Sequence, residues 1–229
     1  MAGLSGLPQS RRDRKSYTGL KGFVLILHLW VYCGENNLAL PPFDMRGLLP
    51  PVNGGDDTHP DRSPYFCTMT ELCSALGTSD HRKALLRNLI SYRAIIASDD
   101  FVEGVQFING SFVENIEAIE GRHPNDIDVF SILAPPAKYV STPALWQATG
   151  SAFWQNEIID NTKNKARFSV DCYALMLNVR DLGNFLRQSL YWYSLFSHKR
   201  SNHDWKGFAA VPLNAADDQA ALAALAGGP

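Results

Sequence analysis

The chain has few cysteines, almost no excess charge and no apolar run long enough to cross a membrane. Its four cysteines, Cys33, Cys67, Cys73 and Cys172, form no CxxC pair and no zinc-finger ladder. Cys67 and Cys73 are close enough in sequence to pair or to bind metal, but we expect free thiols, as in the reducing cytosol. The formal net charge of -2 gives no overall basic field for nucleic acid. These absences predict a cytoplasmic protein without a membrane anchor.

Two glycine-rich motifs of nucleotide-binding loops are also missing, the Walker loop and the dinucleotide signature. Any phosphate site must therefore be built from other residues. What remains is an ordinary globular composition, 45% hydrophobic and 19% charged, without internal repeats. A chain of 229 residues is long enough for one sizeable domain with appendages.

The N-terminal segment differs in character from the rest of the chain. Basic residues between positions 11 and 21 precede an apolar run at residues 23–33, and no A-x-A cleavage pattern follows. Three interpretations remain: an extension outside the domain, a strand or helix packed on the domain, and an export signal. We predict the first, with residues 1–37 as a poorly ordered extension. The domain then covers residues 38–213, and residues 214–229 form a helical tail.

Two helices are predicted with defined beginnings. Residues 68–77 start with a capping box formed by Thr68 and Glu71. The next helix, residues 78–97, has Ser79 as its expected N-cap. Its apolar residues recur every three or four positions and define one buried face: Leu85, Leu89, Tyr92 and Ile96.

The following segments alternate between strands and helices, after an irregular arm at residues 40–61 that is rich in Pro, Gly and Asp. This alternation predicts a compact α/β or α+β domain. We expect the strands that carry Phe107, Asp128 and Asp171 to be neighbours in one sheet. The expected strands are residues 102–110, 127–133 and 166–177, and the expected helices are residues 111–120, 146–159, 180–198 and a short one in the alanine-rich tail.

Two aspartates stand one residue apart in an apolar run. On a strand, Asp126 and Asp128 point to one face, while Ile127 and Val129 point to the other. Burying one unpaired carboxylate is costly and two like charges cost more, so a bound cation is the first candidate for offsetting that cost. Mg²⁺ commonly binds one or two carboxylates and takes its other ligands from water and substrate phosphate. A lone Asp-x-Asp in a turn is otherwise often only a cap or a solvated loop.

Other residues around this pair carry matching chemistry. Gly110 lets a phosphate approach the backbone, and the Ser111 hydroxyl and helix-terminal N–H groups can hold its oxygens. Asp171 lies in a later apolar strand, where a third carboxylate completes a two-metal site or acts as a base on an attacking hydroxyl. We therefore predict Asp126, Asp128 and Asp171 as catalytic residues and as ligands of Mg²⁺ or Mn²⁺, and Gly110 and Ser111 as nucleotide-binding residues.

Basic residues precede the strand of Asp171. Lys163, Lys165 and Arg167 are either a solvated charge run or a phosphate site, and we count Lys163 and Lys165 among the nucleotide-binding candidates. Cys172 is expected to be a buried packing residue. The aromatic helix at residues 180–198 is expected to contribute to the core with one face, which contains Leu190, Tyr191, Ser194, Leu195 and His198.

The order of these motifs resembles the nucleotidyltransferase fold of the DNA polymerase β-like superfamily. The resemblance depends on Gly110, Ser111, Asp126, Asp128 and Asp171. It implies a mixed sheet flanked by helices, and an enzyme that uses Mg²⁺ to transfer a nucleoside monophosphate from a nucleoside triphosphate to an acceptor hydroxyl. Small proteins of this superfamily often belong to toxin–antitoxin or phage-defence modules, a setting implied by analogy of fold alone.

A longer resemblance, to the bacterial DUF6932 family, runs from about residue 40 to about residue 213 and leaves out the N-terminal segment. It implies the fold and the metal-site residues but no acceptor. The segments that carry it are LPPFDMRGLLPP, RSPYFCTMTEL, NGSFVENIEAIEGRHPNDIDVF, VDCYALMLN, YWYSLFSHKR and WKGF.

Two classes of function follow from these patterns. In the first, the protein is an enzyme whose acceptor is a protein Ser, Thr or Tyr, an RNA end or another nucleotide. In the second, it is a catalytically silent, antitoxin-like module that binds a nucleotide or a partner protein. Three clustered carboxylates favour the enzyme, because a binding module has less need of them.

Overall fold

The computed structural model describes residues 40–54, 56 and 58–227. The predictions made for residues 1–37 therefore concern a segment outside the described residues. Within the described part of the chain, no helix combines the length and the apolar character needed to cross a membrane.

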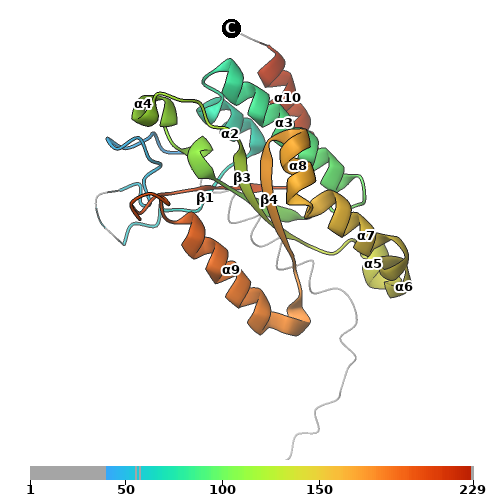
Figure 1. Ribbon diagram of the computed structural model, residues 1–229. Helices are drawn as coiled ribbons and strands as arrows, with labels where there is room; N and C mark the ends of the chain where they lie inside the picture. Colours follow the sequence, from blue (N-terminus) through green and yellow to red (C-terminus); the bar gives the residue numbers. More distant parts are fainter. Residues whose placement is uncertain (1–39, 55, 57, 228–229) are drawn as a thin grey trace, which may run out of the picture.

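The described residues form a five-stranded mixed sheet in the order β1-β5-β2-β3-β4 (Figure 1). β1 and β5 are parallel, β2 is antiparallel to both β5 and β3, and β3 is parallel to β4. The strands that carry Phe107, Asp128 and Asp171 are β2, β3 and β4, so the prediction that they are neighbours in one sheet is confirmed. The strands are β1 (Tyr65–Phe66), β2 (Gly104–Asn109), β3 (Ile127–Leu133), β4 (Val170–Met176) and β5 (Ala209–Pro212).

Helices lie on both faces of this sheet, as expected for a mixed α/β domain (Figure 1). The α-helices are α2 (Met69–Leu76), α3 (Asp80–Ala97), α4 (Ile116–Glu120), α5 (Ala137–Ser141), α6 (Pro143–Leu145), α7 (Ser151–Phe153), α8 (Asn161–Phe168), α9 (Leu182–Phe196) and α10 (Ala215–Ala226). Short 3-10 segments are η1 (Gly110–Val113) and η4 (Val179–Asp181), and π-helical turns are η2 (Trp146–Gly150) and η3 (Trp154–Ile158).

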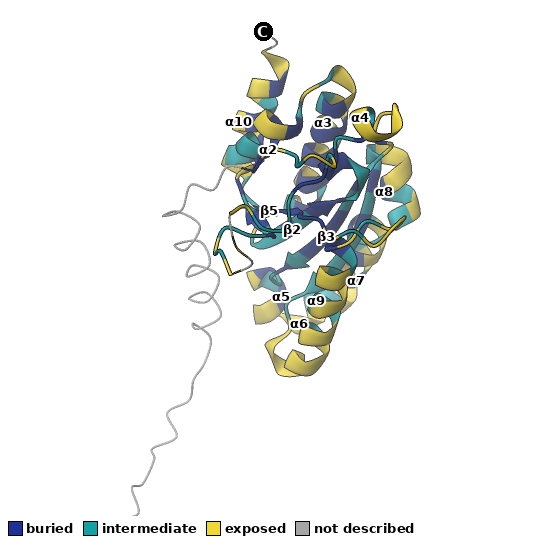
Figure 2. Cartoon of the chain, turned by 90° about the vertical axis from the view of Figure 1, so that its left-hand side faces the viewer, coloured by how far each residue is buried: buried dark blue, intermediate teal, exposed yellow. Residues whose placement is uncertain are grey.

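The main hydrophobic core lies between the sheet and the helices α2, α3, α8 and α10. The predicted apolar face of α3 is buried in it, and both predicted helix starts are confirmed: Thr68 and Glu71 form the capping box, and Ser79 accepts from the Arg82 N–H. Ile127 and Val129 on β3 point into the same core, as the alternation of the strand predicts. Figure 2 shows the strands and the inner helix faces buried and the outer turns exposed.

The tail helix α10 is fastened to this core by a buried ion pair. Arg93 Nε on α3 donates to Asp218 Oδ1 on α10 over 2.8 Å, and Arg93 Nη1 donates to Gln106 Oε1 over 3.0 Å. The remaining guanidinium nitrogen donates to the Pro212 carbonyl oxygen at the end of β5. One arginine therefore joins α3, α10 and two strands, and Ala221 and Leu225 of the tail are buried beside them.

The helix α9 covers the opposite face of the sheet (Figure 1). Trp192 stacks on Phe130 with ring centroids 5.0 Å apart, and Phe196 packs edge-on against Phe208. The expectation that the Leu190 face of this helix would be core is wrong: Leu190 is 65% exposed and Tyr191 57% exposed. The helix is amphipathic, but its apolar arc is wider than the contact with the sheet.

Three local predictions are corrected by the structure. The helix expected at residues 111–120 is divided into η1 and α4. The strand expected to begin at residue 166 begins at Val170, because Ala166 to Phe168 form the last turn of α8 and Ser169 ends that helix in a left-handed conformation with φ of 53°. The strand β5 was not predicted; it is short, and its two neighbouring strands provide its hydrogen bonds.

Candidate functional site

Three polar residues form a row across β2, β3 and β4. Asn109 is at the end of β2, and Asp128 and Asp171 are near the starts of β3 and β4. Asn109 on β2 is paired in register with Asp128 on β3, and Asp128 is paired with Asp171 on β4. Residues opposite each other in a sheet share a face, so the three side chains lie on the face that α9 covers further along. Asp126 directly precedes β3 and lies near Asp171, since one lysine contacts both. The predicted carboxylates are therefore brought together.

The structure shows a steric reason for glycine at position 110, besides the predicted approach of a phosphate. Its φ is 80°, and a Cβ atom there would lie 1.9 Å from Asp128 Oδ2. The missing side chain thus makes room for the carboxylate itself, in a backbone conformation that L residues rarely adopt. Ser111 follows in η1, and this four-residue segment is too short to offer a helix-dipole site for phosphate.

The two aspartates of the row differ in acidity. Burial, the largest cause, acts together with the negative charges of Asp126 and Asp171 to raise the pKa of Asp128 to about 6, and the opposing charges of Arg200 and Lys206 only partly offset this rise. For Asp171 burial acts in the same direction, but hydrogen bonds from Asn161 and Tyr173 and the charge of Lys165 lower its pKa below the usual value. Asp171 therefore stays ionised, while Asp128 is the group that a nearby cation would most stabilise.

Two cationic side chains from different segments, α8 and the loop after α9, lie close to the carboxylates. Lys165 on α8 lies with its Nζ 2.6 Å from Asp126 Oδ2 and 3.4 Å from Asp171 Oδ2. Arg200, in the loop after α9, lies with Nη2 3.6 Å from Asp128 Oδ1. Lys165 was predicted near a phosphate, and the structure places it beside the acids.

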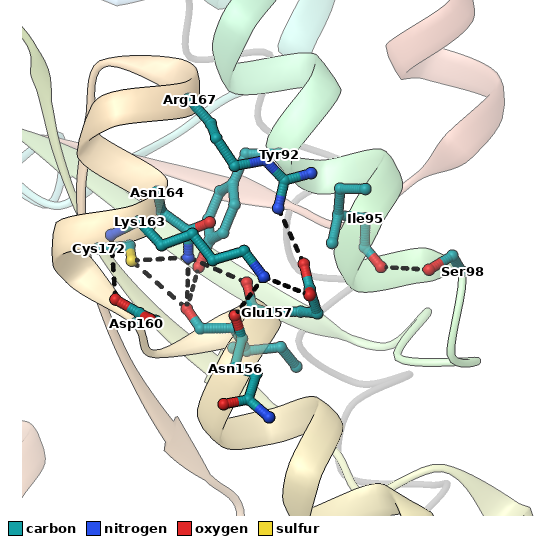
Figure 3. A network of polar contacts seen from close by, with 11 residues as sticks. Tyr92, Ile95, Ser98, Asn156, Glu157, Asp160, Lys163, Asn164, Arg167 and Cys172 are labelled. Carbon is teal, nitrogen blue, oxygen red and sulfur yellow. Dashed lines mark hydrogen bonds and ion pairs between the residues drawn. The ribbon is translucent and has the colours of Figure 1, made fainter.

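Lys163, the other predicted nucleotide-binding lysine, lies on the other side of α8, since two residues on a helix are about 200° apart. Its ammonium group contacts Glu157 and the Asn156 carbonyl oxygen, and Arg167 also donates to Glu157, over 2.9 Å (Figure 3). These contacts fix α8 against η3.

Deeper in the same contact network, Asn164 donates to Cys172 Sγ over 3.3 Å and to the Glu157 carbonyl oxygen, and Tyr92 donates to the Ile158 carbonyl oxygen (Figure 3). Cys172 is buried, as predicted for a packing residue. The network holds the helix that presents Asn161 and Lys165 to Asp171. Its role is to position the site from behind the sheet.

Several site residues were not found by sequence reasoning. Asn109, Asn161 and Tyr173 surround the aspartates but have no charge and no spacing motif. Arg200 and Lys206 were not among the predicted site residues. The one signal for Asn109 is a polar residue at the end of an alternating strand, directly before the Gly-Ser pair.

The chemistry of these side chains fits a hard divalent cation. Asp126, Asp128 and Asp171 offer carboxylate oxygens, the ligands that Mg²⁺ prefers. Asn109 adds a buried Oδ1 atom that has no hydrogen-bond partner in the described part of the chain. In the conformation described, no three His, Cys, Asp or Glu side chains of residues 40–54, 56 and 58–227 converge as a metal-binding group, and Lys165 lies between two of the carboxylates.

Comparisons with known proteins give one match. A family model described as a family of unknown function, DUF6932, matches residues 41–212. No curated protein and no solved structure matches the chain. The matched segment contains all five strands of the sheet and every acidic residue of the site. The chain belongs to the DUF6932 family.

Proposed function

We propose that this protein is a Mg²⁺-dependent nucleotidyltransferase, which transfers a nucleoside monophosphate from a nucleoside triphosphate to an acceptor hydroxyl. The observation that carries the proposal is the row of carboxylates: Asp128 and Asp171 are paired on adjacent strands, and the Gly110-Ser111 turn lies against Asp128. Mn²⁺ is the natural substitute for Mg²⁺ at such an oxygen-rich site.

The order of elements supports the same proposal. A Gly-Ser turn follows β2, two aspartates stand at the start of antiparallel β3, and a third stands on parallel β4. This is the arrangement that the resemblance to the DNA polymerase β-like superfamily implies. A cation held there would stabilise the negative charge that develops on the transferred phosphoryl group.

The carboxylates have distinct roles in this scheme. The lowered pKa of Asp171 makes it a weak base, so it serves as a ligand and not as the main proton acceptor. The raised pKa of Asp128 shows that its charge is poorly compensated, which favours cation binding at this position. Asn161 and Lys165 keep Asp171 oriented.

In the reaction, the acceptor oxygen forms a bond to the α-phosphorus as the bond to the bridging oxygen breaks, and pyrophosphate leaves. The proton of the acceptor hydroxyl passes to a carboxylate of the site or to water. In this scheme the Ser111 hydroxyl donates to a phosphate oxygen, and Lys165 exchanges its carboxylate partners for phosphate. The acceptor class stays open: a protein hydroxyl, an RNA end or a second nucleotide, in a toxin–antitoxin or phage-defence setting.

Release of pyrophosphate from each nucleoside triphosphate, with Mg²⁺ or Mn²⁺, tests the proposal. We expect release with at least one nucleotide in the presence of the host's own lysate, and a loss of about 1000-fold or more in Asp128→Ala, because the variant lacks a ligand of the cation that stabilises transition-state charge. Equal release by Asp128→Ala and wild type would overturn the proposal.

A second candidate is a binding module without catalysis. One observation favours it: Lys165 contacts both Asp126 and Asp171 in the described conformation, so these two acids have a cationic partner without a metal. Such a module would bind nucleotide, or none, and release no pyrophosphate under any condition. Wild-type protein that binds Mg²⁺–ATP without turnover in any lysate would favour it.

A further inference from the structure

A short basic loop lies next to the candidate site and contributes Arg200 and Lys206 to it. Residues 199–206 connect α9 to β5 and are closed into a compact turn, because the Lys199 N–H donates to the Asp204 carbonyl oxygen and the Lys206 N–H donates to the Ser197 carbonyl oxygen. His198 and Trp205 form an isolated bridge across its base. These backbone hydrogen bonds therefore give the loop a defined conformation.

The loop is fastened to the Gly110-Ser111 turn. The buried Lys206 side chain donates to the Gly110 carbonyl oxygen over 3.1 Å and forms an ion pair with the buried Glu114. Lys199 Nζ lies 3.7 Å from the other carboxylate oxygen of Glu114. Any displacement of the turn would break these contacts, so the loop and the Gly-Ser turn form one unit beside Asp128.

Arg200 is the member of this loop whose charge is available to a ligand. Its side chain is 76% exposed, and its Nη2 lies 3.6 Å from Asp128 Oδ1, which is longer than a hydrogen bond. Within the described residues this is its one ion pair. The guanidinium group is therefore exposed to solvent beside Asp128, and its planar N–H donors are available to a ligand.

We propose that Arg200 binds the outer phosphates of the nucleoside triphosphate and thereby defines the polyphosphate subsite. This inference rests on the proposed function. Guanidinium groups bind phosphate oxygens through two parallel hydrogen bonds, a geometry that lysine does not offer. Arg200 and Lys165 contact different carboxylates, so the subsite lies on the Asp128 side and the α-phosphate lies nearer Asp171.

Binding of inorganic tripolyphosphate to the full-length protein, measured by titration calorimetry with and without Mg²⁺, tests the subsite without requiring turnover. Arg200→Ala should weaken binding roughly 10- to 100-fold, the effect of losing charge-assisted hydrogen bonds. The affinity of Arg200→Lys should lie between those of wild type and Arg200→Ala, since lysine keeps the charge and lacks the planar donors. Arg187→Ala is the matched control: this arginine is exposed on α9, and its side chain donates a hydrogen bond to Asn184. It should bind as wild type does.

The outcomes separate this inference from the proposed function. Tripolyphosphate affinity that is equal in wild type and Arg200→Ala, or no binding to wild type, overturns the subsite. Pyrophosphate release by wild type would leave the nucleotidyltransferase proposal standing in that case. Arg200-dependent binding without pyrophosphate release from any nucleotide would support the subsite and favour the binding module. Because Arg200 is exposed, its substitution should not change the melting temperature.

Discussion

The two faces of the sheet differ in how well their buried charged side chains are paired. On the face covered by α2, α3, α8 and α10, the buried Arg93 has a carboxylate, an amide and a carbonyl partner, all within 3.0 Å. On the α9 face, Asp128 is half-enclosed among Asp126 and Asp171, and its cationic neighbour Arg200 is 3.6 Å away. The first arrangement stabilises the fold, while the second leaves negative charge poorly compensated. A carboxylate in such surroundings is a candidate for binding a cation or another ligand.

Arg93→Ala gives the largest expected loss of stability. Removing one partner of a buried ion pair leaves Asp218 and Gln106 without their donors, which costs about 3–5 kcal/mol. Lys165→Ala removes a half-exposed lysine of α8 that contacts Asp126 and Asp171 at the candidate site, and it should cost about 1 kcal/mol or less. Urea unfolding of both variants measures the difference. Similar losses for the two would show that the faces do not differ in the way described.

Gly110→Ala should combine a moderate loss of stability with a loss of function. Alanine in the left-handed conformation costs about 1–2 kcal/mol, and the added Cβ would collide with the Asp128 carboxylate. Gly121 is a matched control, because its φ is 65° and nothing lies within 4 Å of an added Cβ. Gly121→Ala should share the backbone penalty and keep nucleotide turnover. Full turnover in Gly110→Ala would contradict the contact between Gly110 and Asp128.

Asp128→Asn should have the smallest effect on stability, and it should stabilise the protein where the other substitutions destabilise it. The pKa of Asp128 is raised from 3.8 to about 6 in the folded chain, so the folded state binds a proton more readily than the unfolded state. Wild-type stability therefore falls as the pH rises from about 4 to about 6, and the loss is complete above that window.

In Asp128→Asn the amide does not ionise, so this pH-dependent loss of stability is absent. In EDTA, the variant should be more stable than wild type by about 1 kcal/mol above pH 7, since each pKa unit corresponds to about 1.4 kcal/mol and the amide recovers a part. The gain should vanish near pH 4. Melting curves across this range measure it, and a variant that is less stable at pH 8 would show that Asp128 is well compensated.

The fold was predictable where local sequence carries the information. The strand at residues 127–133 and the caps of α2 and α3 were found because alternation and capping are local patterns. The strand β5 was missed because Ala209–Pro212 has little side-chain pattern, and its partners are far away in sequence. The packing of α10 was missed for the same reason: Arg93 and Asp218 are 125 residues apart.

The sequence alone pointed to the acidic residues of the candidate site but not to the residues around them. Asp126, Asp128 and Asp171 stand out because a carboxylate in an apolar strand is costly. Asn109 and Arg200 do not stand out, since a polar residue at a strand end and a basic residue after a helix are both common. Only the register of the sheet and the shape of the 199–206 loop bring them to Asp128.

The central claim is that the nucleoside monophosphate is transferred. The most direct measurement incubates the purified full-length protein and Mg²⁺ with lysate of its own host and either α-³²P- or γ-³²P-labelled nucleoside triphosphates. The account predicts that label from the α position appears on an acceptor, depends on Asp128, and that label from the γ position appears only in pyrophosphate. Transfer of the γ label to an acceptor, or no transfer of the α label from any nucleotide, would contradict it.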